Sequence, residues 1–404
     1  MRILIYEALP DINKAKMFAE MARQLQKQGH QLLLLLEEQL VYTLDHCLTE
    51  QGVISCHHTI AAYVADDPNL PYTLLPVPAS TYQNVTEENI ADVLATVRTA
   101  RLVYYHEIFT GFKPDITLIW NGQAEHQQDF LSITSSIYAR VYYLEHGWFP
   151  QSDTLYLDPL GVNAASLLSK TPTSPLSEEQ LIRISQWQKD YLASSPISQP
   201  KKNHLFIPLQ IDTDTNISLY SPFPSMQLFI RYLENWVPSH YSITIRPHPL
   251  ANYRYPLESL RADVIFDQTT PIEQLIAESS IVVGINSTVL LQAMAYGKAT
   301  YAFGEGVFSS SGCIKRLKRE DRFPIPEAID PLVSNQFLYQ LIFEKQISIG
   351  QYDDLLKDID HSTHTPKDSS FAYHRYSRAK VLLYKTIHRL ALYLRLSCAP
   401  FKQP

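Results

Sequence analysis

The sequence predicts an α/β protein made of two doubly wound domains, each a largely parallel sheet with helices on both faces. The chain opens with two short apolar runs, residues 3–6 and 32–36, on either side of residues 11–28, which have helical spacing. That β-α-β opening is typical of a parallel sheet. The same alternation begins again after about residue 200, so we expect two Rossmann-like domains of similar size facing a crevice.

The first domain continues with two more helix and strand pairs. Helical spacing over residues 87–108 and 127–138 precedes strand-like runs at residues 116–120 and 141–144. A last helix, near residues 176–192, is followed by the segment SSPISQPKKN, whose Ser and Pro content is typical of a linker. The first domain is therefore predicted to span residues 1–198.

The second domain is predicted to span residues 199–368. Apolar strands are expected at residues 205–209, 243–245, 264–266 and 281–284, and helices at residues 225–236, 271–278 and 287–296. Thr270, Pro271 and Glu273 predict a helix start with Thr270 as the capping hydroxyl. Gly297 is expected to end the last of these helices.

Composition and charge exclude several functions. The 34 Lys and Arg against 41 Asp and Glu give a net charge of −7, so no overall basic field attracts nucleic acid. The four cysteines form no CxxC pair, which argues against a disulfide framework or structural zinc. The start of the chain does not have the pattern of a signal peptide, and no apolar run approaches the roughly 20 residues that span a bilayer. We expect a cytoplasmic protein.

Residues 369–404 form a basic tail. It holds seven Lys or Arg and no Asp or Glu, so the rest of the chain carries −14. Its apolar residues loosely follow helical spacing, which predicts a basic amphipathic helix. We expect this helix to pack back on a domain, and the alternative is an additional peripheral contact with an anionic inner membrane.

The strongest local signal is a strand, loop and helix over residues 281–298. It places Gly284, Asn286, Ser287 and Thr288 at a helix start, where free N–H groups and the helix dipole favour an anion such as phosphate. The alternative is that Asn286 or Ser287 only caps its own helix.

Two other strand ends carry polar residues. Arg246 and His248 lie in Arg246-Pro247-His248-Pro249, where the prolines stiffen the loop and the side chains suit phosphate or carboxylate, although a turn histidine is the plainer interpretation. Gln210, Asp212, Asp214 and Asn216 follow the strand before it. Their carboxylates suit acid-base, nucleophilic or cation-binding roles, and the alternative is a polar turn that caps the next element.

In the first domain, the strand ending at Leu144 runs into Glu145, His146 and Trp148. Trp148 is expected to be exposed, and sugar rings stack on aromatic side chains, so this segment suits a carbohydrate acceptor. Trp120-Asn121-Gly122 ends the preceding strand in a similar way, and core packing of both tryptophans is the alternative. No GxxxxGK-S/T, HExxH or GxSxG motif indicates a triphosphate, zinc or hydrolase site.

Taken in order, these segments resemble a known family. Glu145-His146-Gly147, the Gln210 to Asp214 segment, the RPHP loop and the segment from Gly284 to Lys298 are similar to those of capsule- and lipopolysaccharide-type β-Kdo transferases. These bacterial glycosyltransferases have the GT-B architecture and use CMP-Kdo. The resemblance covers about residues 140–305.

The resemblance implies a role for each matching residue. His248 and the Ser287-Thr288 pair would bind the CMP phosphate, and Asp214, or else Asp212, would be the catalytic carboxylate at the anomeric carbon. Glu145 would act near the acceptor hydroxyl. Around these, the expected donor-binding residues are Gln210, Arg246, Pro249 and Asn286, and the expected acceptor-side residues are His146, Trp148 and Trp120. No cofactor and no metal are expected, because helix ends and side chains neutralise the leaving phosphate.

The implied function is retaining transfer of Kdo from CMP-β-Kdo to a surface-polysaccharide or lipid-linked glycan acceptor, as in capsule or lipopolysaccharide and O-antigen synthesis. GT-B sialyltransferases share the His-Pro and paired-hydroxyl motifs, so a CMP-sialic acid transferase is the alternative enzyme. A noncatalytic nucleotide-sugar-binding scaffold protein is the alternative from another class. The motifs support a CMP-sugar donor more strongly than they select the sugar or its acceptor.

Overall fold

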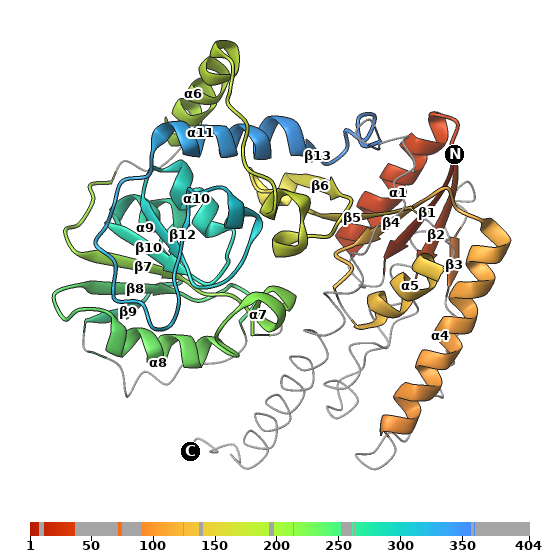
Figure 1. The fold of residues 1–404 in the computed structure, drawn as a ribbon, viewed down its shortest axis with the longest axis horizontal. Coiled ribbons are helices and arrows are strands. Elements are labelled where there is room, and N and C mark those ends of the chain that lie inside the picture. The colour runs from red at the N-terminus through yellow and green to blue at the C-terminus, as the bar shows by residue number, and fades with distance from the viewer. Residues whose placement is uncertain are drawn as a thin grey trace. The chain divides into compact units, whose positions relative to one another are not determined.

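The computed structural model describes residues 1–7, 12–36, 72–74, 90–123, 125–136, 140–193, 198–212, 214–251, 261, 263–356 and 359 (Figure 1). The described chain forms two compact units. The first comprises Met1–Val162 with the described residues from Lys345 onward, and the second comprises Asn163–Glu344. The predicted basic tail lies outside the described residues.

The first unit contains a seven-stranded sheet in the order β13-β6-β5-β4-β1-β2-β3. Five neighbouring strands are parallel: β3 (Tyr72–Leu74), β2 (Gln31–Leu36), β1 (Arg2–Glu7), β4 (Ile116–Trp120) and β5 (Arg140–His146). β6 (Thr154–Asp158) is antiparallel to β5, and β13 (Gln346–Ser348) is antiparallel to β6. The sequence does not predict β3, β6 or β13.

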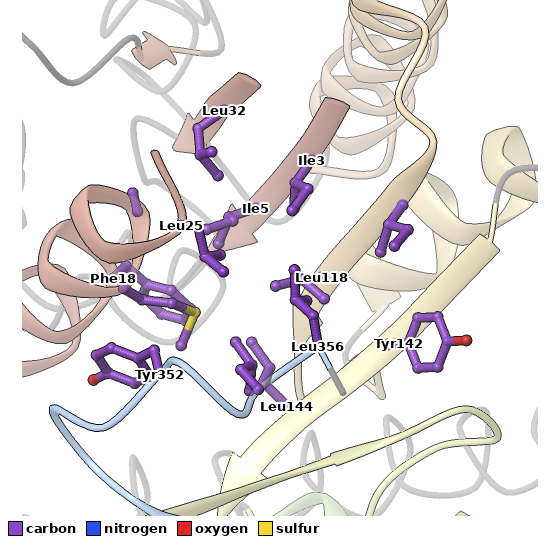
Figure 2. Close-up of a cluster of buried hydrophobic side chains, with 14 of the residues drawn as sticks. Ile3, Ile5, Phe18, Leu25, Leu32, Leu118, Tyr142, Leu144, Tyr352 and Leu356 are labelled. Carbon is purple, nitrogen blue, oxygen red and sulfur yellow. The ribbon is translucent and has the colours of Figure 1, made fainter. Parts of the chain in front are cut away.

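Helices cover both faces of this sheet. On one face, Ile3 and Ile5 of β1 pack against Phe18 and Leu25 of α1 (Ile12–Lys27), as Figure 2 shows. On the other face, Tyr6 packs with residues of α4 (Ile90–Phe112) and α5 (Glu125–Ser136). Because successive side chains of β1 enter opposite cores, its residues from Ile3 to Tyr6 are all apolar instead of alternating.

The second unit contains a six-stranded parallel sheet in the order β12-β11-β10-β7-β8-β9. Its strands are β7 (His204–Pro208), β8 (Ser242–Arg246), β9 (Val264–Phe266), β10 (Ile281–Gly284), β11 (Ala299–Ala302) and β12 (Lys315–Arg316). The helices are α6 (Glu178–Ala193), α7 (Thr215–Tyr220), α8 (Met226–Trp236), α9 (Ile272–Glu278), α10 (Val289–Ala295) and α11 (Pro331–Tyr339). The order is that of a doubly wound Rossmann-like sheet, so the predicted fold class is confirmed for each unit.

The division between the units differs from the predicted ranges, because Lys345 and the described residues after it belong to the first unit, whereas α6 belongs to the second. This helix precedes the linker-like segment, yet it packs in the second unit, where Gln188 Nε2 donates to the carbonyl of Ala295 at 2.7 Å. Tyr191 also lies edge-on to Tyr296, with ring centroids 5.8 Å apart. The Ser- and Pro-rich segment therefore does not mark the boundary between the two units.

Among the described residues, no helix combines the length and the apolar character needed to cross a membrane.

Candidate functional site

The carboxyl edge of the second sheet brings together most of the predicted donor residues. The chain order reverses between β7 and β10, which are neighbours, and ligands of open α/β sheets bind beyond the strand ends at such a switch point. Gln210, Asp212 and Asp214 follow β7, whereas Asn286, Ser287 and Thr288 follow β10. Arg246 ends β8 and lies in register with Pro208 of β7.

Asn286 joins the segments that follow β7, β10 and β11. Its backbone N–H donates to Gln210 Oε1 at 3.2 Å. Its Nδ2 donates to the carbonyls of Asn216 at 3.0 Å and Glu305 at 3.1 Å. Asn286 and the buried Gln210 therefore bond to protein groups and to each other, and they fix the shape of the edge.

Gly304 shows how closely the chain segments approach here. A Cβ at Gly304 would lie 2.9 Å from the carbonyl oxygen of Tyr220 and 3.0 Å from that of Ile285. Any other residue would push the segment after β11 away from the edge.

Both acidic residues after β7 lie at helix starts. Asp214 is the N-cap of α7, where its Oδ1 accepts the N–H of Asn216 at 2.8 Å. Asp212 Oδ1 accepts the N–H of Met226 at 2.6 Å, in the first turn of α8. The capping interpretation is thus correct for one oxygen of each carboxylate, and the positive ends of the helices suit their negative charge. The catalytic role remains a prediction.

Arg246 holds a neighbouring turn. Its Nη1 donates to the carbonyls of Asp267 at 3.2 Å and Thr270 at 2.9 Å. The hydroxyl and N–H of Thr270 and the N–H of Thr269 donate to the Asp267 carboxylate and lower its pKa to about 2. The prediction that Thr270 caps α9 is therefore wrong. The N-cap residue is Pro271, and no side chain makes a cap hydrogen bond at this helix start.

His248 has a defined proton position. Its Nδ1 accepts the N–H of Leu250 at 3.1 Å, so the neutral ring carries its proton on Nε2. Partial burial lowers the pKa of His248 below its ordinary value. A neutral imidazole with an Nε2–H can donate one hydrogen bond to an anionic oxygen.

Ser287 and Thr288 differ in their local bonding. The buried Ser287 Oγ accepts the N–H of Val289 at 3.3 Å, which agrees with the capping alternative. Thr288 is the N-cap residue of α10, and its side chain makes no cap hydrogen bond. The backbone before them approaches α10 closely, since a Cβ on Gly284 would lie 3.1 Å from Leu290 Cδ2.

In the first unit, Glu145 lies near the end of β5 with both carboxylate oxygens bonded. Oε2 accepts from Asn121 Nδ2 at 2.7 Å, and Oε1 accepts the N–H of His146 at 3.0 Å. A Cβ on Gly147 would lie 2.3 Å from Thr154 Oγ1, so only glycine fits after the Glu-His pair. The sequence places Asn121 at a strand end, but no local pattern in it pairs Asn121 with Glu145.

The two tryptophans predicted on the acceptor side are core residues. Trp120 and Trp148 are each 2% exposed. Trp148 stacks on Tyr156 with centroids 4.4 Å apart, so the expectation that Trp148 is exposed is wrong. His146 lies edge-on to Trp120 at 4.9 Å, and Lys14 Nζ lies 4.8 Å from the centroid of the same ring. Stacking of a sugar would need other rings.

Within the part of the chain that the structure describes, no group of three or more His, Cys, Asp or Glu is arranged to hold a metal ion.

Comparison with known proteins gives a family match in the second half of the chain. Residues 180–352 match the family described as capsule polysaccharide biosynthesis protein, a segment that includes every predicted donor residue. The resemblance to capsule-type proteins was predicted for about residues 140–305, and it is confirmed where the two ranges overlap, over residues 180–305. Protein FixF of Sinorhizobium fredii is 25% identical over 212 residues, which are 50% of this chain and 51% of that protein. The chain thus spans about half the length of this curated relative.

Solved structures resemble the chain at low identity. KpsC of Thermosulfurimonas dismutans, described as a β-Kdo 2,7 transferase, is 18% identical, with 66% of this chain and 96% of that chain covered and a TM-score of 0.43. The β-Kdo 2,4 transferase of the same KpsC is 14% identical, with 58% and 85% covered and a TM-score of 0.41. UDP-GlcNAc 2-epimerase from Neisseria meningitidis is 14% identical, with 96% and 100% covered and a TM-score of 0.32.

Proposed function

We propose that this chain is a retaining glycosyltransferase of bacterial surface-polysaccharide synthesis, which moves Kdo from CMP-β-Kdo to a glycan or lipid-linked acceptor. One observation carries the proposal. The capsule polysaccharide biosynthesis match spans residues 180–352, and within it the strand ends that hold Asp214, His248 and Ser287 meet at one switch-point edge. That edge is where a doubly wound sheet binds a nucleotide.

The donor phosphate would be held without a metal ion. His248 would donate from Nε2, the atom that the Leu250 bond to Nδ1 leaves protonated. The Thr288 hydroxyl and the backbone at the start of α10 would add further donors, and Ser287 would add its O–H while still accepting from Val289. Together these groups would stabilise the charge that develops on CMP as it leaves.

Retention of the β configuration would follow from two successive displacements. An Asp214 oxygen would attack the anomeric carbon as its bond to the CMP phosphate oxygen breaks, which gives a sugar ester. The acceptor oxygen would then displace Asp214, with its proton passing to Glu145. Asp212 is the alternative nucleophile, and its short bond to the N–H of Met226 supports a structural role at α8 instead.

The test has a binding part and a product part. We expect CMP to raise the unfolding temperature, since a ligand at about 100 times its Kd adds roughly 2.7 kcal/mol, whereas UDP and ADP should have little effect. CMP-Kdo and CMP-sialic acid are then incubated with a panel of glycan acceptors, and the anomeric configuration of the product is read by NMR. Stabilisation by UDP alone, or an α-linked product, would refute the donor or the retaining mechanism.

The same assay separates the alternatives. Transfer from CMP-sialic acid alone would indicate a sialyltransferase. CMP binding without turnover of either donor, together with no effect of Asp214→Asn on that binding, would indicate a nucleotide-sugar-binding scaffold.

A cytoplasmic location with peripheral membrane contact is part of the proposal, because a lipid-linked acceptor lies at the inner membrane. The basic residues of the tail would supply on the order of 1 kcal/mol each near an anionic surface. Co-sedimentation with anionic liposomes, for the full chain and for a variant with Gln at the seven basic tail positions, measures this. Equal binding of both proteins would leave the tail without a membrane role.

A further inference from the structure

We infer that Asn121 is a positioning residue for Glu145 and, through Glu145, sets the angle at which the acceptor hydroxyl is deprotonated. The inference rests on the proposed function, because it takes Glu145 to act on the acceptor. Asn121 directly follows β4, and Glu145 lies on the adjacent strand β5. The 2.7 Å bond from Asn121 Nδ2 to Glu145 Oε2 joins them across the sheet edge.

The orientation of the Asn121 amide is fixed by its own bonds. Its Oδ1 accepts the N–H of Gln123 at 3.1 Å, so Nδ2 must face Glu145. Its backbone N–H donates to the carbonyl of Leu144 at 2.8 Å, which extends the β4–β5 ladder beyond the Trp120 and Leu144 pair. Asn121 is thus attached to β5 through its backbone and through its side chain.

The backbone at Asn121 is held from the helix side as well. Asn121 has φ 61° and Gly122 has φ 79°, a left-handed pair that Asn and Gly tolerate best. Gln127 Nε2 donates to the carbonyl of Trp120 at 2.7 Å, and Gln128 Nε2 donates to that of Gly122. The donor to Glu145 is therefore organised before any substrate binds.

The two bonds to Glu145 come from different directions. Asn121 donates to Oε2, and the N–H of His146 donates to Oε1, so the carboxylate cannot rotate freely. Each oxygen can accept more than one hydrogen bond, which leaves capacity for the acceptor O–H. As the acceptor oxygen bonds to the sugar carbon, its proton passes to a Glu145 oxygen, and the bond from that carbon to its leaving group breaks.

The first variant to make is Asn121→Gly, which retains the left-handed backbone and removes only the amide. We expect kcat for transfer to fall at least about tenfold, in line with loss of a bond to a charged group. CMP affinity should stay within about twofold, because CMP binding does not involve this bond. Asn203→Gly is the matched control: Asn203 has φ 51° and precedes β7, at the opposite end from the residues of the donor edge.

A double-mutant cycle with Glu145→Gln shows whether Asn121 acts through Glu145. If it does, Asn121→Gly/Glu145→Gln is no slower than Glu145→Gln alone, within about twofold. A merely structural role would slow both backgrounds by the same factor, and that result overturns the inference.

Asn121→Asp gives a readout that does not depend on the glycine variant folding. Carboxylates at positions 121 and 145 would lie within hydrogen-bond distance and share a proton. The acidic limb of the pH profile of kcat/KM should therefore move up by about one pH unit or more. His146 and Lys14 also lie against Trp120, and they are present in both proteins, so the difference reports position 121. An unchanged limb, or Asn121→Gly at the wild-type rate, overturns the inference. Glu145→Gln at the wild-type rate would instead overturn the proposed role of Glu145.

Discussion

Two substitutions at Asp214 separate its cap from its chemistry. Asp214 Oδ1 accepts the N–H of Asn216 at the start of α7. Asn caps a helix about as well as Asp, so Asp214→Asn retains this bond and removes the charge. Asp214→Ala removes both. The pair therefore distinguishes a residue that only holds the loop from one that attacks the sugar.

The expected magnitudes differ for the two readouts. Losing the cap costs about 1 kcal/mol, which for a unit of this size lowers Tm by about 2–4 °C. Asp214→Asn keeps the cap bond and loses the attraction between carboxylate and helix dipole, which is worth at most about 1 kcal/mol. Loss of the nucleophile should nevertheless lower kcat at least about a thousandfold in both variants, or roughly 4 kcal/mol of transition-state stabilisation.

Thermal unfolding and CMP release with CMP-Kdo and an acceptor measure the two effects. With a poor acceptor, wild-type protein should also form a sugar adduct, which intact mass and peptide mapping assign to the segment containing Asp214. Asp212→Asn should be milder, because its amide oxygen can still accept the N–H of Met226. Wild-type turnover in Asp214→Asn, or activity loss that follows Tm across both variants, would refute the nucleophile assignment.

Three further predictions concern binding, metal and pH. His248→Ala should weaken CMP binding at least about tenfold, and His248→Gln, whose amide nitrogen replaces Nε2, should recover part of it; calorimetry giving equal affinities for all three proteins would remove His248 from the site. EDTA should leave turnover unchanged, whereas loss that a divalent ion reverses would make Asp212 and Asp214 metal ligands. Burial lowers the pKa of His204, so the unfolded chain binds more protons: its contribution to stability is complete above about pH 6.5 and falls as the pH drops toward the folded-state pKa. Urea unfolding between about pH 7.5 and 5 measures how the free energy of unfolding falls with pH. The fall should be shallower in His204→Asn, whose side chain can keep the bond to Ser242. Equal slopes in the two proteins would contradict the prediction.

The strands and helices that face a core could be predicted because burial leaves a local pattern. β1, β4, β7 and β10 are runs of apolar residues, and α1 and α8 have an apolar face, since each must cover or be covered by the sheet. β12 and β13, which have two and three residues, lie at the edges of their sheets. Such short edge strands form through pairing with a neighbour and leave almost no pattern of their own.

By itself, the sequence determined the fold class and the strand ends that carry the polar residues, because parallel strands must present their carboxyl ends at one edge. Only the tertiary structure decided what those residues contact. Trp148 is buried because it stacks on Tyr156, while its N–H and that of Phe149 donate to Gln346, far along the chain. In the same way, Asn121 meets Glu145 only when β4 pairs with β5. Hydrogen-bond partners and burial depend on which segments become neighbours in space. The whole fold determines those neighbours, and the residues adjacent in sequence do not.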